Sequence, residues 1–162
     1  MKVFDSSSFI AFVHDVECSS FLERLSNSHR IIIPRQVLSE LTRPKTRSEA
    51  ERLINDGIVE TLEVDSELYT KVRREHPSLG PGECGVVTLS LQAGGTGLAG
   101  EKSPVCVCDD KAARTAFPGV RWVWTEELLE FLRGRGLIDE AEYSLSMTRL
   151  RASPFFGSGG AR

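Results

Sequence analysis

Five short apolar runs, each followed by a stretch with helical character, constrain the fold of this chain more than any other feature. The runs lie at residues 2–4, 30–34, 58–64, 105–108 and 120–124. Between and after them, apolar spacing and capping residues predict helices at 6–13, 17–25, 35–41, 47–57, 65–76, 83–93, 111–117, 125–132 and 139–149. This alternation predicts an α/β fold with a central, mostly parallel five-stranded sheet covered by helices on both faces.

Length and composition indicate one domain of ordinary globular character. The chain has 162 residues, of which 40% are hydrophobic and 27% are charged. We expect a domain over residues 1–150 and a flexible tail over 151–162. No apolar run approaches the roughly 20 residues that cross a bilayer, and the N-terminus lacks the pattern of a secretion signal, so we expect a cytoplasmic protein with no membrane partner. The net charge of −3 disfavours general coating of nucleic acid, although local arginine patches remain compatible with it.

Acidic residues follow two of the predicted strands. Asp5 comes directly after the first strand, and the adjacent pair Asp109 and Asp110 comes after the fourth. In open parallel sheets, ligands bind at the carboxyl ends of the strands where the strand order reverses. If these two strands are neighbours there, their carboxylates meet. Glu40, late in the helix after the second strand, and Glu83, in the first turn of an apolar helix, can reach the same edge.

Each acid also has a structural explanation. Asp5 and Asp110 could cap helices, Glu83 could complement a helix dipole, and Glu40 could be a half-exposed helix residue. As a group, however, carboxylates about 4 Å apart repel by roughly 4 kcal/mol per pair at an effective dielectric of 20. A divalent cation would offset this repulsion, and an all-oxygen donor set favours Mg²⁺ or Mn²⁺ over zinc. Such a site suits the hydrolysis of phosphodiesters.

These residues occur in motifs that resemble those of PIN-domain ribonucleases. The motifs are "VFDSSSFI" with Asp5, "VLSEL" with Glu40, "LGPGECGVVTLSL" with Glu83, and "VCVCDDKAARTAF" with Asp109 and Asp110. The "GE" and "DD..AR..A" patterns are similar to the VapC-like toxin branch, and "VWTEELLEFLRGRGLI" is similar to that branch's "GT..vL..A...G.i" segment. The resemblance covers about residues 1–150. It implies a three-layer α/β/α PIN-like fold and a metal-dependent endoribonuclease.

The resemblance also implies roles for individual residues. Asp5, Glu40 and Glu83 would be catalytic acids, with Asp5 and Glu83 holding the metal. Asp109 and Asp110 are both candidates for the remaining metal acid, and Asp110 is favoured because the family's last acid commonly follows the strand by two positions. Glu83 departs from the aspartate that many members carry, so its direct ligation is an open question. Ser7 would support Asp5 by a hydrogen bond, and Arg114 would bind substrate phosphate or else pair with a neighbouring acid.

The implied partners are an RNA substrate, a cognate antitoxin protein and a second copy of the chain in a homodimer. Two other functions compete with the ribonuclease. One is a PIN-like module that binds RNA or protein without cutting it. The other is a phosphatase of the haloacid-dehalogenase type, which normally needs a second aspartate two residues after the first, where this chain has Ser7.

Overall fold

The computed structural model describes residues 1–16, 18–95 and 103–153 and contains a five-stranded parallel sheet in the order β3-β2-β1-β4-β5. The strands are β1 (Lys2–Phe4), β2 (Ile31–Pro34), β3 (Glu60–Leu62), β4 (Val105–Val107) and β5 (Arg121–Val123). The chain runs outward from β1 through β2 to β3 and then crosses to β4 on the other side of β1. The strand order therefore reverses between β1 and β4, so the condition under which the acids after these two strands meet is fulfilled.

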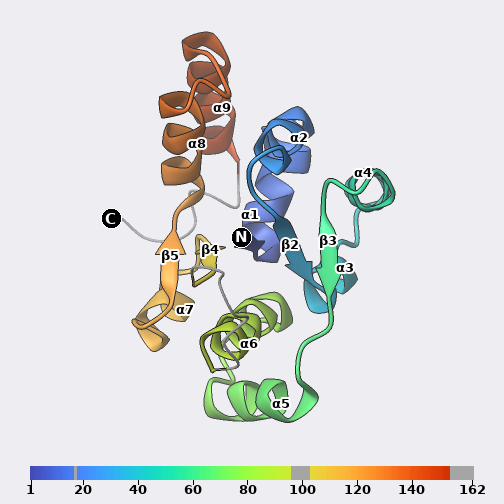
Figure 1. The fold of residues 1–162 in the computed structure, drawn as a ribbon, viewed down its shortest axis with the longest axis vertical. Coiled ribbons are helices and arrows are strands. Elements are labelled where there is room, and N and C mark those ends of the chain that lie inside the picture. Colours follow the sequence, from blue (N-terminus) through green and yellow to red (C-terminus); the bar gives the residue numbers. More distant parts are fainter. Residues whose placement is uncertain (17, 96–102, 154–162) are drawn as a thin grey trace.

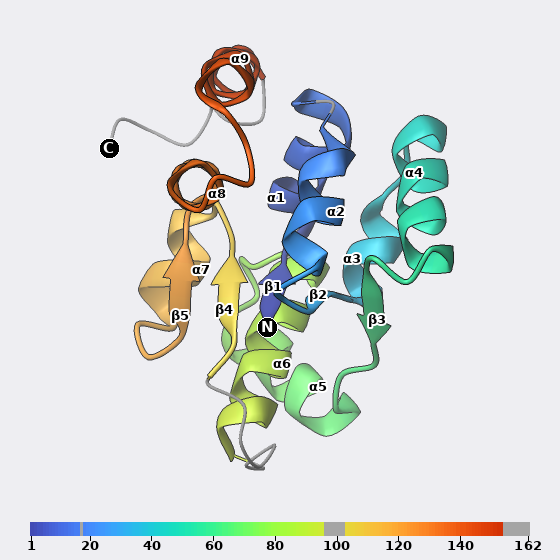
Figure 2. The same cartoon turned by 45° about the horizontal axis from the view of Figure 1, so that its top comes forward.

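The helices lie on both faces of this sheet, as Figures 1 and 2 show. They are α1 (Ser6–Ile10), α2 (Ser19–Ser26), α3 (Arg35–Glu40), α4 (Pro44–Asn55), α5 (Ser66–Glu75), α6 (Pro81–Gly95), α7 (Lys111–Ala116), α8 (Thr125–Gly134) and α9 (Glu140–Ala152). A π-helical turn, η1 (Ala11–Asp15), continues α1, and the Val16 amide donates to the Ala11 carbonyl at 2.8 Å. None of the described helices is long and apolar enough to cross a membrane.

Alternating strand residues separate two apolar layers. Phe4, Ile33 and Val107 point to the face packed by α1, α2 and α8, where Phe9, Phe12 and the leucines of α8 complete the larger core. Val3 and Cys106 point to the opposite face, against Val86 and Leu89 of α6. Helix α5 packs on the outside of α6. The expected three layers are therefore present, and α6 is covered on both sides.

Several predicted boundaries differ from those observed. Helices α4 and α6 begin earlier than expected because Pro44 and Pro81 start them, and proline is well suited to the first turn, where its missing amide hydrogen has no helical acceptor. The tail expected from residue 151 is helical as far as Ala152, and residues 154–162 lie outside the described part of the chain. The connection expected at 94–103 likewise falls largely on residues that the structure does not describe.

Helix α6 lies close to the start of α3 at Gly85. A Cβ atom built on Gly85 would lie 2.8 Å from Pro34 Cβ and 3.2 Å from Gln36 Oε1. Pro34 Cβ belongs to a fixed ring beside the backbone, so it cannot move aside as a flexible side chain would. Because Gly85 has no side chain, α6 can pack closely against Pro34, at the sheet edge that carries the site described below.

We predict that Gly85→Ala lowers the free energy of unfolding by about 1–3 kcal/mol, because overpacking exceeds the gain of about 1 kcal/mol in helix propensity. Gly94→Ala, in the same helix, is the matched control because nothing lies within 4 Å of a Cβ built there. It should leave stability unchanged or slightly raised. Urea denaturation of both variants measures the difference, and equal stability of the two would contradict the close packing.

Candidate functional site at the carboxyl ends of β1 and β4

Asp5 lies at the centre of the candidate site, at the carboxyl end of the central strand. Its residue is 0% exposed, and its amide donates to the Val107 carbonyl of β4 at 3.1 Å. The carboxylate caps α1 by accepting from the Ser8 amide at 2.8 Å, and the Ser7 hydroxyl lies 3.1 Å from each of its oxygens. Burial raises the pKa of Asp5 to about 6, although bonds from Cys108 and Ser8 oppose this rise. The hydrogen bond expected for Ser7 is thus present.

The adjacent residues Asp109 and Asp110 serve different helices. Both oxygens of Asp109 accept hydrogen bonds from Thr125, one from its amide at 2.8 Å and one from its hydroxyl, so Asp109 fastens the start of α8 to β4. Asp110 caps α7 by accepting from the Ala113 amide at 2.7 Å through Oδ1. Its second oxygen accepts no hydrogen bond from the described residues and is available to a ligand.

Glu40 and Glu83 approach each other from α3 and α6, which pack together. A Cβ atom built on Gly80 would overlap Glu83 Oε2 and lie 3.6 Å from Glu40 Oε1. A Cβ atom built on Gly82 would overlap Glu40 Oε2 and the Ser6 hydroxyl, which donates to that same oxygen. The two glycines therefore leave the space that both glutamate carboxylates occupy.

The charges of the other acids act on Glu83. Partial burial and, after it, the neighbouring charges of Asp5, Glu40 and Asp110 together raise the pKa of Glu83 to about 7. The charge of Asp109 in turn contributes to the raised pKa of Asp5. The structure therefore brings all five predicted acids into one electrostatic neighbourhood. Among the described residues, Glu83 forms no ion pair with a lysine or arginine.

Sequence reasoning missed the residues that hold the glutamates in place. Ser6 fixes Glu40, and Gly80 and Gly82 make room for the pair. The "GPGE" segment carries a signal for the glycines, because two glycines around the first proline of a helix indicate close approach of another group. No pattern could have singled out Ser6 from its neighbours Ser7 and Ser8. The Cys108 thiol also contributes a hydrogen bond to Asp5.

Arg114 lies beside the acids but does not pair with them. Its guanidinium stacks on the Trp124 ring, with Cζ 3.7 Å from the ring centroid, and Nη1 donates to the Cys108 carbonyl at 3.4 Å. Arg114 forms no ion pair with any described residue. Of the two roles left open for Arg114, the pairing with a neighbouring acid is therefore not the one observed.

The carboxylate oxygens of this site are the ligand type that a hard divalent cation prefers, but they are not arranged around a common point. Carboxylate oxygens are the ligands that Mg²⁺ and Mn²⁺ prefer, and the buried carboxyl of Asp5 beside Glu83 has much to gain from a cation. Within the described ranges, however, no three His, Cys, Asp or Glu side chains are arranged to hold an ion as they stand. Glu40 is held by Ser6, and Asp5 by Ser7 and Ser8. Magnesium often keeps several water ligands, so few direct carboxylates are required.

The raised pKa of Asp5 predicts a pH-dependent effect of Asp5→Asn in EDTA. The pKa of Asp5 is 3.8 when exposed and about 6 when folded, so ionisation of the native state costs stability as the pH rises through this window. Asn stays neutral, so the stability of the variant relative to the wild type should rise by about 2.4 kcal/mol from pH 4 to pH 7. Urea denaturation at several pH values measures this, with Asp139→Asn, another helix cap, as the control. A difference independent of pH would contradict the prediction.

Comparisons with known proteins identify the family to which these motifs belong. A family model described as DUF3368, a PIN domain, matches residues 1–147. No curated protein and no solved structure matches the chain. PIN domains are generally nucleases that act on RNA and typically use divalent metals. The match spans the parallel sheet, the acids at its carboxyl edge and most of α9. The chain therefore belongs to the PIN-domain family.

Proposed function

We propose that this protein is a metal-dependent endoribonuclease that hydrolyses phosphodiester bonds in RNA. The observation that carries this proposal is the fully buried Asp5 carboxyl, which shares its neighbourhood with Glu83 and has a raised pKa. A chain that needed only a helix cap at Asp5 would gain nothing from placing further acids around it. A cation that binds there would remove the repulsion among them. The membership of the PIN family supports the same function.

We assign the metal to Asp5, Glu83 and Asp110. Asp110 is preferred to Asp109 because both oxygens of Asp109 are engaged by Thr125, whereas Asp110 keeps one oxygen available. Glu40, which Ser6 orients, would act beside them by accepting a hydrogen bond from a water ligand of the ion. When bound, Mg²⁺ or Mn²⁺ neutralises phosphate charge, lowers the pKa of a bound water and stabilises the leaving oxygen.

Residues around the site hold the acidic side chains in fixed orientations. Ser7 and the Ser8 amide hold the Asp5 carboxylate in one rotamer, so its position is fixed before any ligand binds. The caps formed by Asp5 and Asp110 place the first turns of α1 and α7 at the same edge, and these turns provide rigid support for the acids. Arg114 supplies a positive charge for an RNA phosphate at the margin of this site.

The toxin role, an antitoxin partner and a homodimer rest on the resemblance to the VapC-like branch alone and stay predictions. A neighbouring reading frame for a small DNA-binding protein would support the toxin role. Relief of growth inhibition when that protein is co-expressed would test it directly.

We predict that Asp110→Asn reduces RNA cleavage about 100-fold or more at nearly unchanged stability, because Asn still caps a helix but lacks the charge. Asp109→Asn is the matched control. It should lower the free energy of unfolding by about 1–2 kcal/mol through the weakened bonds from Thr125, while cleavage well below the melting temperature is largely retained. The rate at which each variant cleaves labelled RNA in Mn²⁺ tests the prediction. A large loss of cleavage in Asp109→Asn with little loss in Asp110→Asn would assign the metal to Asp109 instead. Full cleavage by both Asp110→Asn and Asp5→Asn would refute the assignment of the active site to these acids.

We also predict that Mg²⁺ or Mn²⁺ stabilises the wild type but not Asp5→Asn at neutral pH. At a metal concentration 100 times the dissociation constant, linkage gives about 2.7 kcal/mol. Thermal unfolding with and without the metal measures this effect, and Ca²⁺ at the same ionic strength serves to separate specific binding from screening. A metal-independent melting temperature together with intact RNA binding would favour the non-catalytic module. A covalent phosphate on Asp5 would favour the phosphatase.

A further inference from the structure

Arg114 is placed where an ion pair with Asp110 would be expected. Asp110 caps α7 and Arg114 follows one turn later, with the Arg114 amide 3.3 Å from the Asp110 carbonyl. Side chains four residues apart lie on the same side of a helix, and Asp and Arg at this spacing usually attract each other. In this structure the guanidinium instead turns to the Trp124 ring. The absence of the ion pair between Arg114 and Asp110 therefore has a physical cause in Trp124.

The energies favour the observed stack. A guanidinium that lies over a Trp face is attracted to the ring at least as strongly as it would be to a carboxylate at this helical spacing. Arg is also weakly hydrated and planar, so it loses little solvation when it lies flat on a ring. The bond from Nη1 to the Cys108 carbonyl fixes the guanidinium further.

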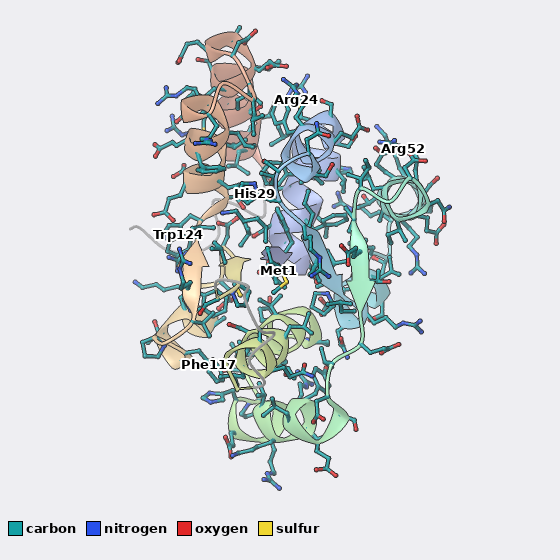
Figure 3. All side chains as sticks on the ribbon, viewed as in Figure 1. Met1, Arg24, His29, Arg52, Phe117 and Trp124 are labelled. Atoms are coloured by element: carbon teal, nitrogen blue, oxygen red, sulfur yellow. The ribbon has the colours of Figure 1, made fainter. Side chains whose placement is uncertain are left out.

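Trp124 is itself held at the edge that carries the acids. Figure 3 shows it at the junction between β5 and α8. Its amide donates to Glu127 Oε2 at 2.7 Å, and the next residue, Thr125, is bonded to Asp109. The backbone at Trp124 is thus anchored from both α8 and the β4 end, and the residue is half-buried. It provides a fixed platform for one face of the guanidinium.

We infer that Trp124 is a positioning residue that holds Arg114 as a phosphate-binding group beside the acidic cluster and keeps it from neutralising Asp110. This inference rests on the proposed ribonuclease function and deepens it. A guanidinium has five N–H donors, and the only hydrogen bond of the Arg114 side chain to a described residue uses Nη1. The remaining donors can bind the phosphate of an RNA strand whose neighbouring linkage lies over Asp5. The acid cluster meanwhile keeps its negative charge for a cation.

The test measures RNA binding without cleavage. The parent is the Asp5→Asn protein in EDTA, and the probe is a short fluorescein-labelled single-stranded RNA of mixed sequence, followed by anisotropy at several salt concentrations. Arg114→Gln should weaken binding about ten-fold or more and lower the slope of log K against log salt by about 0.7. Arg121→Gln is the charge-matched control, because Arg121 begins β5 and lies at the opposite end of the strands. It should leave binding unchanged.

Trp124→Leu should weaken binding nearly as much as Arg114→Gln, although it removes no charge. In the Arg114→Gln background, Trp124→Leu should cause no further loss of RNA affinity. In the Asp110→Asn background, its effect on RNA affinity should shrink to about three-fold or less, because Arg114 then has no acid to pair with. Trp124→Phe should retain most of the binding, since an aromatic face remains. Recovery on loss of Asp110 is a result that a merely structural role for Trp124 would not produce.

Arg114→Lys keeps the proposal falsifiable if Trp124→Leu fails to fold. Lysine lacks the planar fork, so it should pair with Asp110 and bind RNA little better than Gln at this position. RNA binding as tight as that of the Asp5→Asn parent, in either Arg114→Lys or Trp124→Leu, would overturn the inference. A loss of binding affinity caused by Trp124→Leu in the Arg114→Gln background would overturn it as well. If the parent protein bound no RNA at all, the proposed function itself would fail together with this inference. Normal binding by the parent and by every variant would remove the inference alone.

Discussion

The burial of one carboxyl group, Asp5, at the end of the central strand is the constraint on which the rest of the site depends. The group is 0% exposed and is surrounded by α1, β4 and the first turn of α6. Water cannot solvate it, so protein dipoles must, and the Ser8 amide and the Ser7 hydroxyl do this in part. The incomplete compensation leaves its pKa raised. A parallel sheet whose order reverses beside this strand is what brings other acids to the same place.

The structural and the functional interpretations of the acids prove to be compatible. Asp5 and Asp110 are helix caps, as the simpler explanation has it, and they also face the other carboxylates. A cap uses one oxygen of a carboxylate and leaves the second for another partner. Asp110 keeps its second oxygen open, whereas Asp109 gives both oxygens to Thr125 and the second oxygen of Asp5 lies 3.1 Å from the Ser7 hydroxyl. The position of an acid after a strand therefore does not decide its role, because the partners of its oxygens differ from one acid to the next.

The fold could be predicted from sequence almost completely, because the alternation of apolar runs and helices leaves few other arrangements. Asp5, Glu40, Glu83, Asp109 and Asp110 could also be predicted to lie together. Asp110 is favoured over Asp109 by the resemblance alone, and the two bonds from Thr125 that engage Asp109 could not be predicted, since Thr125 belongs to a different element. The side-chain partner of Arg114 could not either, because helical spacing favoured Asp110 and the Trp124 ring comes from a different element. Contacts between elements far apart in sequence carry no local signal.

The two glycines of the "GPGE" segment have a consequence for how such proteins are recognised. The atoms that a methyl group would displace at Gly80 and Gly82 are the tips of Glu83, Glu40 and Ser6, not the backbone. A relative with alanine at either place would fold normally and would retain every acidic letter of the motif, yet its carboxylates would be pushed apart. Surveys that count only acids would list that relative as an active enzyme. The empty volume beside a charged group is as much a part of the motif as the charge.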